Sequence, residues 1–336
     1  MFNGLLFFPI TPYLSDGEVD LAELAAHVGR GVDAGAGGVF VACGTGEFSA
    51  LEPDEYSGVV SAAVTTVAGR VPVFAGAGGP VRTARRFGDL AAAAGADGVL
   101  LLPPYLTEAT GRGLESYVRA ATREDLPAIV YNRANARFDE RTAVAVATLP
   151  QVIGFKDGAG DLDMMSRIVR AVRDEVEHAP FYFFNGMPTA EVTQRAYRAI
   201  GVPLYSSAAF AFAPRIALAY YDALERGDDT TIATLDRAFY HPLVRLRARG
   251  AGYAVSLIKA GVELAGFPTG GVRPPLTEVA PEHRQELVRI LAAGISAVLD
   301  LYAADAAAAA GADAGAGAGA DAGAGADAGA ARKFVR

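Results

Sequence analysis

The chain has 336 residues, of which 51% are hydrophobic and 20% are charged. This balance predicts a globular protein with a large buried core. The formal net charge of −8 argues against a nucleic-acid partner, because such a chain has little capacity to neutralise phosphates. Its single cysteine, Cys43, excludes an intramolecular disulfide and a cysteine-rich metal site.

No targeting or metal-binding signal stands out. The N-terminal stretch MFNGLLFFPITP lacks the basic start and small-residue cleavage site of a secretory signal, and no apolar run is expected to reach membrane-spanning length. The four histidines are scattered, with no pair at helical ligand spacing. We therefore expect a cytoplasmic protein with no membrane contact, no metal and no organic cofactor.

Short apolar runs alternate with longer stretches of helical length through the first two thirds of the chain. Each run is almost continuously apolar, as is typical of parallel strands covered on both faces. The predicted strands, in chain order, are Leu5–Ile10, Gly38–Ala42, Val71–Ala75, Gly98–Leu102, Ala128–Tyr131, Val152–Lys156, Phe181–Phe184 and Pro203–Ser206.

Eight such strand–helix units predict an α/β fold, a TIM (β/α)8 barrel, over residues 1–226. An open doubly wound sheet is the alternative, but it seldom runs to eight uninterrupted units. Residues 227–302 are predicted to form a C-terminal helical extension, with helices at Asp229–Arg247, Tyr253–Leu264 and Pro281–Tyr302. Residues 303–336 are a low-complexity Ala/Gly/Asp tail with few large side chains to bury, so we expect disorder there.

Lys156 is the first candidate catalytic residue, because barrels hold their catalytic groups at the carboxyl ends of strands. The chain uses arginine for nearly all its cations, and its only lysines are Lys156, Lys259 and Lys333. Unlike arginine, a lysine in an apolar barrel mouth can lose its proton and attack a carbonyl. The competing interpretation is an ion pair between Lys156 and Asp157.

Other strand ends supply candidate partners for this amine. Tyr131 could move protons during imine formation, although an isolated tyrosine there could also simply pack. The Gly44–Thr45–Gly46 turn could bind a carboxylate through backbone amides and a hydroxyl, as could a bidentate Arg133. The candidate substrate-binding residues are Thr45, Gly46, Arg133, Asn135, Asn185, Ser206 and Ser207.

Several motifs together resemble the dihydrodipicolinate synthase and N-acetylneuraminate lyase family of Schiff-base barrel enzymes. They are the TP of FFPITPYLSDGEVD, the GE of GTGEFSAL, the Tyr of YN and the Lys of GFKD. The resemblance extends from Phe7 to about Leu299. It implies that Lys156 is the Schiff-base lysine, that Tyr131 relays protons, and that Thr45 contacts the carboxylate of a keto acid.

Two positions depart from the family's synthases. Gly44 replaces the first of two hydroxyl residues before GE, and Leu106 replaces a tyrosine after PY. The resemblance is closer to a family branch that dehydrates and decarboxylates a keto-sugar diacid, and it implies a homotetramer or dimer of dimers. Two alternatives are an aldolase of the same family that releases pyruvate and an inactive sugar-acid-binding barrel.

Overall fold

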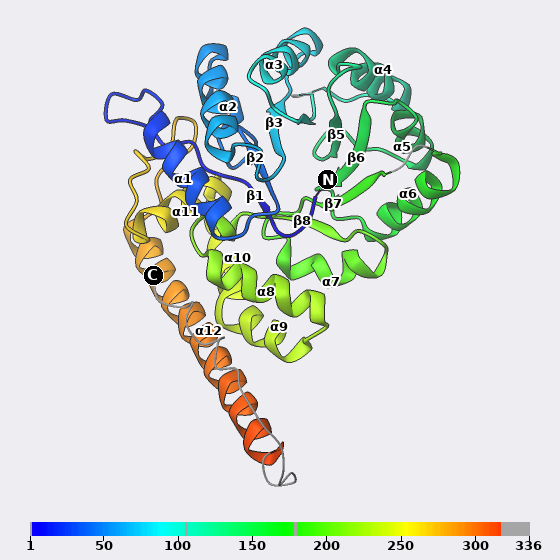
Figure 1. Cartoon of the computed structure of the whole chain (residues 1–336). Helices are drawn as coiled ribbons and strands as arrows, with labels where there is room; N and C mark the ends of the chain where they lie inside the picture. Colours follow the sequence, from blue (N-terminus) through cyan, green and yellow to red (C-terminus); the bar gives the residue numbers. More distant parts are fainter. Residues whose placement is uncertain (1, 105–106, 178–179, 317–336) are drawn as a thin grey trace.

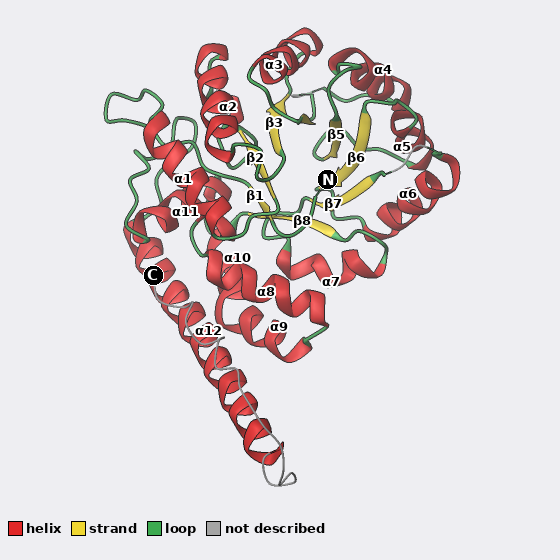
Figure 2. Cartoon of the chain, in the orientation of Figure 1, coloured by secondary structure: helices red, strands yellow, loops and turns green. Residues whose placement is uncertain are grey.

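The computed structural model describes residues 2–104, 107–177 and 180–316 of the chain. Eight parallel strands close into a barrel in sequence order, and helices surround it (Figure 1, Figure 2). The predicted barrel is confirmed. The strands are β1 Leu6–Phe7, β2 Gly38–Val41, β3 Val73–Ala77, β4 Gly98–Leu101, β5 Ala128–Asn132, β6 Val152–Asp157, β7 Tyr182–Asn185 and β8 Leu204–Ser207.

Helices follow the strands and cover the outside of the barrel (Figure 2). Local sequence signals fix several of their starts: the Asp20 carboxylate accepts a hydrogen bond from Glu23 N, and Pro53 occupies the first turn of the next helix. These helices are α1 Leu21–Asp33, α2 Pro53–Val67, α3 Val81–Ala93, α4 Gly111–Ala121, α5 Glu140–Ala147, α6 Leu162–Glu175, α7 Glu191–Ala199 and α8 Pro214–Arg226.

Large apolar side chains fill the barrel interior and close its amino-terminal end. Phe40 and Phe74 are almost fully buried inside. Phe2 stacks on Phe40 at 5.7 Å between ring centroids and meets Phe184 edge-on at 5.4 Å. Because this end is plugged, the space available for a substrate lies at the carboxyl ends of the strands.

The C-terminal extension departs from the predicted single helix over Asp229–Arg247. It consists of α9 Asp229–Leu235, a wider π-helical turn over Asp236–Tyr240, and α10 His241–Arg247. Pro242 has no N–H to donate to the preceding turn, which favours a local change of helical pitch just before it. The next helix, α11 Tyr253–Leu264, has the predicted bounds.

The last helix, α12, begins at Pro281 as predicted but continues to Ala316 instead of ending at Tyr302. Alanine, the commonest residue after Tyr302, has the highest helix propensity, which explains the extension. Disorder was expected over 303–336; the helix contradicts that expectation over 303–316, and residues 317–336 lie outside the described residues. Figure 1 shows α12 reaching away from the barrel.

Residues Pro281–Ala304 of α12 are long and apolar enough, by length and composition alone, to span a membrane. The expectation that no run reaches this length was therefore wrong. One face of the helix, which includes Leu287, Ile290 and Val298, is buried in the hydrophobic core shared with the barrel helices. A packed helix of a globular protein meets the same criteria.

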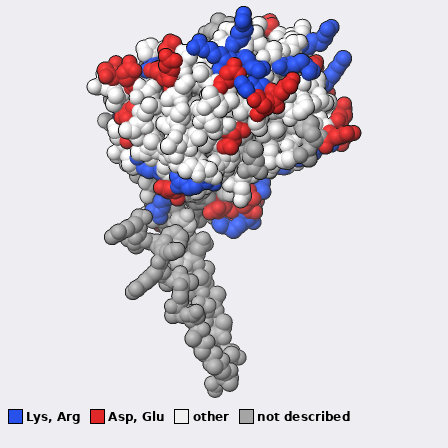
Figure 3. Space-filling model, turned by 45° about the horizontal axis from the view of Figure 1, so that its top comes forward, with Lys and Arg blue, Asp and Glu red and all other residues white. Residues whose placement is uncertain are grey.

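Charged side chains of both signs lie side by side on the face drawn in Figure 3. Several partly exposed side chains form ion pairs; Arg123 pairs with Asp89 and Asp125 at 2.6 Å each. Exposed pairs of this kind contribute about 0–1 kcal/mol to stability. The ion pair between Glu47 and Lys259 is different, because each side chain is only 1% exposed.

Candidate active site

A cavity of about 370 Å³ lies over the carboxyl ends of the strands. Lys156 and Tyr131 form part of its floor, and the turn carrying Thr45 forms part of its wall. Another part of the wall comes from α10 and α11, with Leu243 and Leu257 among its apolar residues. The C-terminal extension therefore completes the cavity as well as packing beside the barrel.

Lys156 lies near the end of β6 with its side chain inside the barrel, and the residue is 4% exposed. Its Nζ lies 3.9 Å from the ring centroid of Phe8 and 4.8 Å from that of Tyr131. Burial, with a further contribution from the Arg133 guanidinium, lowers the pKa of Lys156 to about 7. The Cys43 thiol adds no charge near neutral pH, because burial raises its pKa to about 12.

Tyr131 is the register partner of Lys156 on the neighbouring strand β5. Its hydroxyl donates to the Gly186 carbonyl and accepts from Arg133 Nη1, each at 2.8 Å. Burial raises the pKa of Tyr131, so the phenol stays protonated at neutral pH although Arg133 opposes the effect. The phenol can therefore both donate and accept a proton beside the amine.

Gly186 provides the room in which the lysine and tyrosine meet. A Cβ at this position would lie 2.6 Å from Lys156 Cε and 2.9 Å from Tyr131 Cε2, closer than such atoms approach in real structures. Gly158 has the same role on the other side, where a Cβ would lie 2.8 Å from the Tyr131 hydroxyl. Two glycines thus define the positions of the reactive side chains.

Asp157 faces the outside of the barrel, so the alternative ion pair with Lys156 does not form. Successive side chains on a strand point to opposite faces, and Lys156 takes the inner one. The Asp157 carboxylate accepts hydrogen bonds from Asn132 Nδ2 at 2.6 Å and from the Tyr197 hydroxyl. Among the ion pairs of the described residues, none involves the Lys156 amine.

The same alternation corrects the placement of Asn185 and Ser207, which were expected to face the substrate. Asn185 is the register partner of Asp157 and points outward, where its amide donates to the Ala190 carbonyl at 3.1 Å. The Ser207 hydroxyl donates to the buried Glu191 carboxylate. Ser206, one residue earlier on β8, lines the cavity.

Two further predicted contacts also lie outside the cavity wall. Asn135 is exposed in the loop after β5 and does not line the cavity. Gly46 is the buried residue of the Gly44–Thr45–Gly46 turn, and its carbonyl accepts a hydrogen bond from the Thr11 hydroxyl at 2.7 Å. Of the predicted set, the cavity brings together Lys156, Tyr131, Thr45, Arg133 and Ser206.

Arg247, at the end of α10, is a cavity residue that sequence reasoning missed. Its guanidinium donates to the hydroxyl of Thr189, a β-branched residue held at φ 53°. Such a backbone conformation is strained for threonine and is a feature of functional sites. The arginine occurs more than ninety residues after Lys156 in a helix assigned to the extension, so no local pattern identified it.

Of the two positions that depart from the synthase pattern, Gly44 and Leu106, only Gly44 is among the described residues. Gly44 lines the cavity, and a Cβ there would meet no atom within 4 Å, so the glycine leaves open space. Tyr105 and Leu106 lie outside the described residues. The space at Gly44 is on the same wall as Thr45.

This chain is similar to several known proteins. A relative from Streptomyces coelicolor, called a probable 5-dehydro-4-deoxyglucarate dehydratase, is 55% identical over 87% of this chain and 93% of its own length. A relative of the same name from Delftia acidovorans is 42% identical over 87% of this chain and 95% of its own. The crystal structure of dihydrodipicolinate synthase from Oceanobacillus iheyensis superposes with a TM-score of 0.79 at 28% identity, covering 88% of this chain and 97% of that one.

The model of the dihydrodipicolinate synthetase family matches residues 1–294, which include all eight strands and most of the cavity-lining helices. The closed parallel barrel and a buried lysine at the end of β6 agree with that match. The chain therefore belongs to the dihydrodipicolinate synthetase family.

Proposed function

We propose that this protein is a Schiff-base lyase that converts 5-dehydro-4-deoxy-D-glucarate into 2,5-dioxopentanoate, carbon dioxide and water, as part of glucarate breakdown. The observation that carries this proposal is the buried Lys156 amine, whose pKa of about 7 leaves much of it neutral at physiological pH. The names of the most similar relatives supply the substrate.

The first half of the reaction is a dehydration. Neutral Lys156 attacks the C5 ketone, and loss of water gives a protonated imine. That cation acidifies C4, so removal of a C4 proton gives an enamine, which expels the C3 hydroxyl as water. The product is a C3–C4 double bond conjugated with the iminium.

The second half is a decarboxylation that uses the same electron sink. The C1–C2 bond breaks, carbon dioxide leaves, and its electron pair flows through the conjugated system to the nitrogen. Protonation of the carbon chain converts the C2 enol into an aldehyde, and water releases 2,5-dioxopentanoate from Lys156. Atoms balance with one water and one carbon dioxide released, and the residues perform the sequence without a cofactor.

The residues around Lys156 have separate roles in this proposal. Tyr131 transfers protons during imine formation and hydrolysis, since its hydroxyl lies in a donor–acceptor chain between Arg133 and the Gly186 carbonyl. Thr45 and its turn hold the carboxylate next to the ketone. Ser206, which lines the cavity at the end of β8, contacts a substrate hydroxyl.

The C1 carboxylate, at the far end of the diacid, should be attracted by cations but not bound tightly by them. A carboxylate that must leave as carbon dioxide should not be stabilised strongly in the ground state. Arg133 donates one hydrogen bond to the Tyr131 hydroxyl, and Arg247 donates one to the Thr189 hydroxyl. We assign them the role of steering the C1 carboxylate and the nearby hydroxyls into the cavity.

The decisive experiment measures the products formed from 5-dehydro-4-deoxyglucarate. Wild type should release carbon dioxide and 2,5-dioxopentanoate in equal amounts, whereas Lys156→Ala and Lys156→Arg should release neither. Pyruvate without carbon dioxide would establish the aldolase alternative instead. Borohydride treatment during turnover should label Lys156, and failure to label it would favour the inactive binding barrel.

We further propose that the protein is cytoplasmic and assembles as a homotetramer or a dimer of dimers. The support is an apolar stripe along the exposed side of α12, where Ile295 and Leu299 are 51% and 50% exposed. Stripes of this kind are usually covered by a partner. Sedimentation analysis of the purified chain at micromolar concentration should give a tetramer, and a stable monomer would contradict the proposal.

A further inference from the structure

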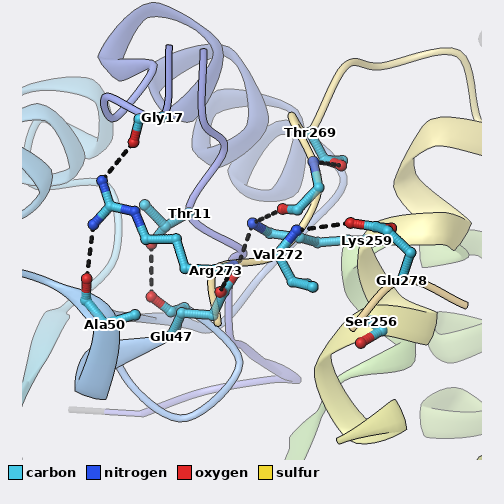
Figure 4. A network of polar contacts seen from close by, with 12 residues as sticks. Thr11, Gly17, Glu47, Ala50, Ser256, Lys259, Thr269, Val272, Arg273 and Glu278 are labelled. Carbon is cyan, nitrogen blue, oxygen red and sulfur yellow. Dashed lines mark hydrogen bonds and ion pairs between the residues drawn. The ribbon is translucent and has the colours of Figure 1, made fainter. Parts of the chain in front are cut away.

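Lys259 is the second of the three lysines, and nothing proposed so far explains it. It lies on α11 and is 1% exposed, with its Nζ 2.6 Å from Glu47 Oε1 (Figure 4). The amine also donates to the Gly271 carbonyl and lies 4.0 Å from the ring centroid of Tyr13. This pocket fits a compact ammonium, whereas the planar guanidinium that the chain uses elsewhere is larger.

Glu47 belongs to the GTGE turn, where its backbone adopts a left-handed conformation with φ 55°. Its second carboxylate oxygen accepts from the Arg273 backbone N–H at 2.9 Å. The Arg273 side chain in turn donates to the Ala50 carbonyl at 2.7 Å (Figure 4). It also donates to the Glu55 carboxylate. The Glu47 carboxylate is therefore held from two directions, by Lys259 on α11 and by the Arg273 backbone in the segment after α11.

The pair joins two walls of the catalytic cavity without entering it. Gly44 and Thr45, just before Glu47, line one wall, and Leu257 and Ile258, just before Lys259, line another. Neither Glu47 nor Lys259 is among the cavity-lining residues. Glu47 lies two residues after Thr45, and Lys259 directly follows Ile258, so a shift of the ion pair would displace both walls.

Stability alone is a poor explanation for this arrangement. Desolvation offsets most of the attraction in a buried ion pair, and well-packed apolar residues of similar volume often serve as well or better. A buried pair does impose one geometry, because an unpaired charge in either position costs several kcal/mol. What this pair fixes is the separation between the turn and α11.

We propose that Glu47 and Lys259 are positioning residues that hold the Gly44–Thr45–Gly46 turn ready to bind the carboxylate next to the ketone. The inference rests on the proposed function, which gives that turn its carboxylate. Its specific consequence is that the pair controls recognition of the keto-acid carboxylate and leaves the reactivity of the Lys156 amine intact.

Borohydride trapping with two simple carbonyl compounds separates these effects. Pyruvate carries a carboxylate next to its ketone, whereas acetone presents the ketone alone. In Glu47→Gln and Lys259→Met, the pyruvate concentration for half-maximal labelling of Lys156 should rise at least tenfold, because a lost charge-assisted contact costs about 1.5–3 kcal/mol. The corresponding acetone concentration should stay within about twofold of wild type, because acetone has no carboxylate to contact the turn.

Two further variants control for stability. Glu225→Gln removes a partly exposed ion pair between α8 and Arg198 of α7, 2.8 Å apart, that belongs to neither the turn nor the contacts of Lys259, and it should label like wild type with both probes. Glu47→Leu combined with Lys259→Met removes both charges, so no buried charge is left unpaired. It supplies the measurement if a single variant fails to fold, and it should keep the pyruvate defect.

Different failures have different meanings in this design. Equal labelling of wild type and the pair variants by pyruvate would overturn the positioning role and leave the Schiff-base mechanism standing. A parallel loss with pyruvate and acetone would also overturn it, because it would indicate general damage to the site. If wild type itself labels with neither probe, the Schiff-base assignment of Lys156 fails, and this inference fails with it.

Discussion

Replacing Lys156 with methionine should stabilise the protein, and by an amount that depends on pH. Burial, aided by Arg133, lowers the pKa of this amine in the folded chain from 10.5 to about 7, while the unfolded chain keeps the ordinary value. Below pH 7 both states are protonated, so the folded state carries the full cost of a buried ammonium. The change in pKa corresponds to about 5 kcal/mol.

Above pH 7 the folded chain loses this proton while the unfolded chain keeps it. The free energy of unfolding of wild type therefore rises with pH relative to the methionine variant, which has no proton there to lose. Well between the two pKa values each pH unit carries about 1.4 kcal/mol, but at pH 7 the folded amine is already half deprotonated, so the advantage of the variant should shrink by about 2 kcal/mol between pH 7 and pH 9.

Urea unfolding of both proteins at pH 6, 7, 8 and 9 measures this difference directly, and subtraction removes groups that titrate alike in both. If the difference in the free energy of unfolding between the two proteins stays constant over this range, the claim that burial lowers the pKa of Lys156 is refuted. The same reasoning predicts that kcat/KM of wild type rises with pH and levels off above about pH 7, because attack requires the neutral amine.

The other predictions concern single substitutions. Gly186→Ala puts a Cβ 2.6 Å from Lys156 Cε, so kcat should fall at least about a hundredfold, with a much smaller effect on the melting temperature. Arg247→Met should raise KM for the diacid about tenfold or more, whereas Arg245→Met, an exposed neighbour on α10, should not. Asn185→Ala should lower the free energy of unfolding by about 1–3 kcal/mol and leave KM within twofold, because its amide only joins parts of the scaffold.

The barrel could be predicted from the sequence because its signal is local. Each buried strand needs a continuous apolar run, and each run is separated from the next by a stretch of helical length. Strand ends shifted by up to three residues: Leu6–Phe7 replaces the predicted Leu5–Ile10, and Val73–Ala77 replaces Val71–Ala75. Backbone pairing with neighbouring strands determines those ends, and the strand's own residues carry little information about it.

The adjacent placement of Lys156 and Tyr131 in the cavity was predictable from residue type and strand position, but the other cavity-lining residues were only partly so. Proximity to a strand end did not distinguish Ser206 from Ser207. Strand alternation could have placed Asn185: with Lys156 on the inner face, Asp157 and its register partner Asn185 point outward. Arg247 could not have been placed in this way. Its position depends on how α10 folds back over the barrel, which is set by tertiary packing between segments far apart in the chain.

The residues proposed for the carbonyl chemistry and those that form the α10–α11 wall of the cavity lie in different parts of the sequence. The amine and the phenol belong to β5 and β6, while residues 243–258 shape much of the opposing wall. Substitutions in that later segment can change which acids fit without disturbing the carbonyl chemistry below. A lineage of such barrels can therefore acquire new substrates by varying one short, contiguous stretch while it inherits the reaction itself unchanged.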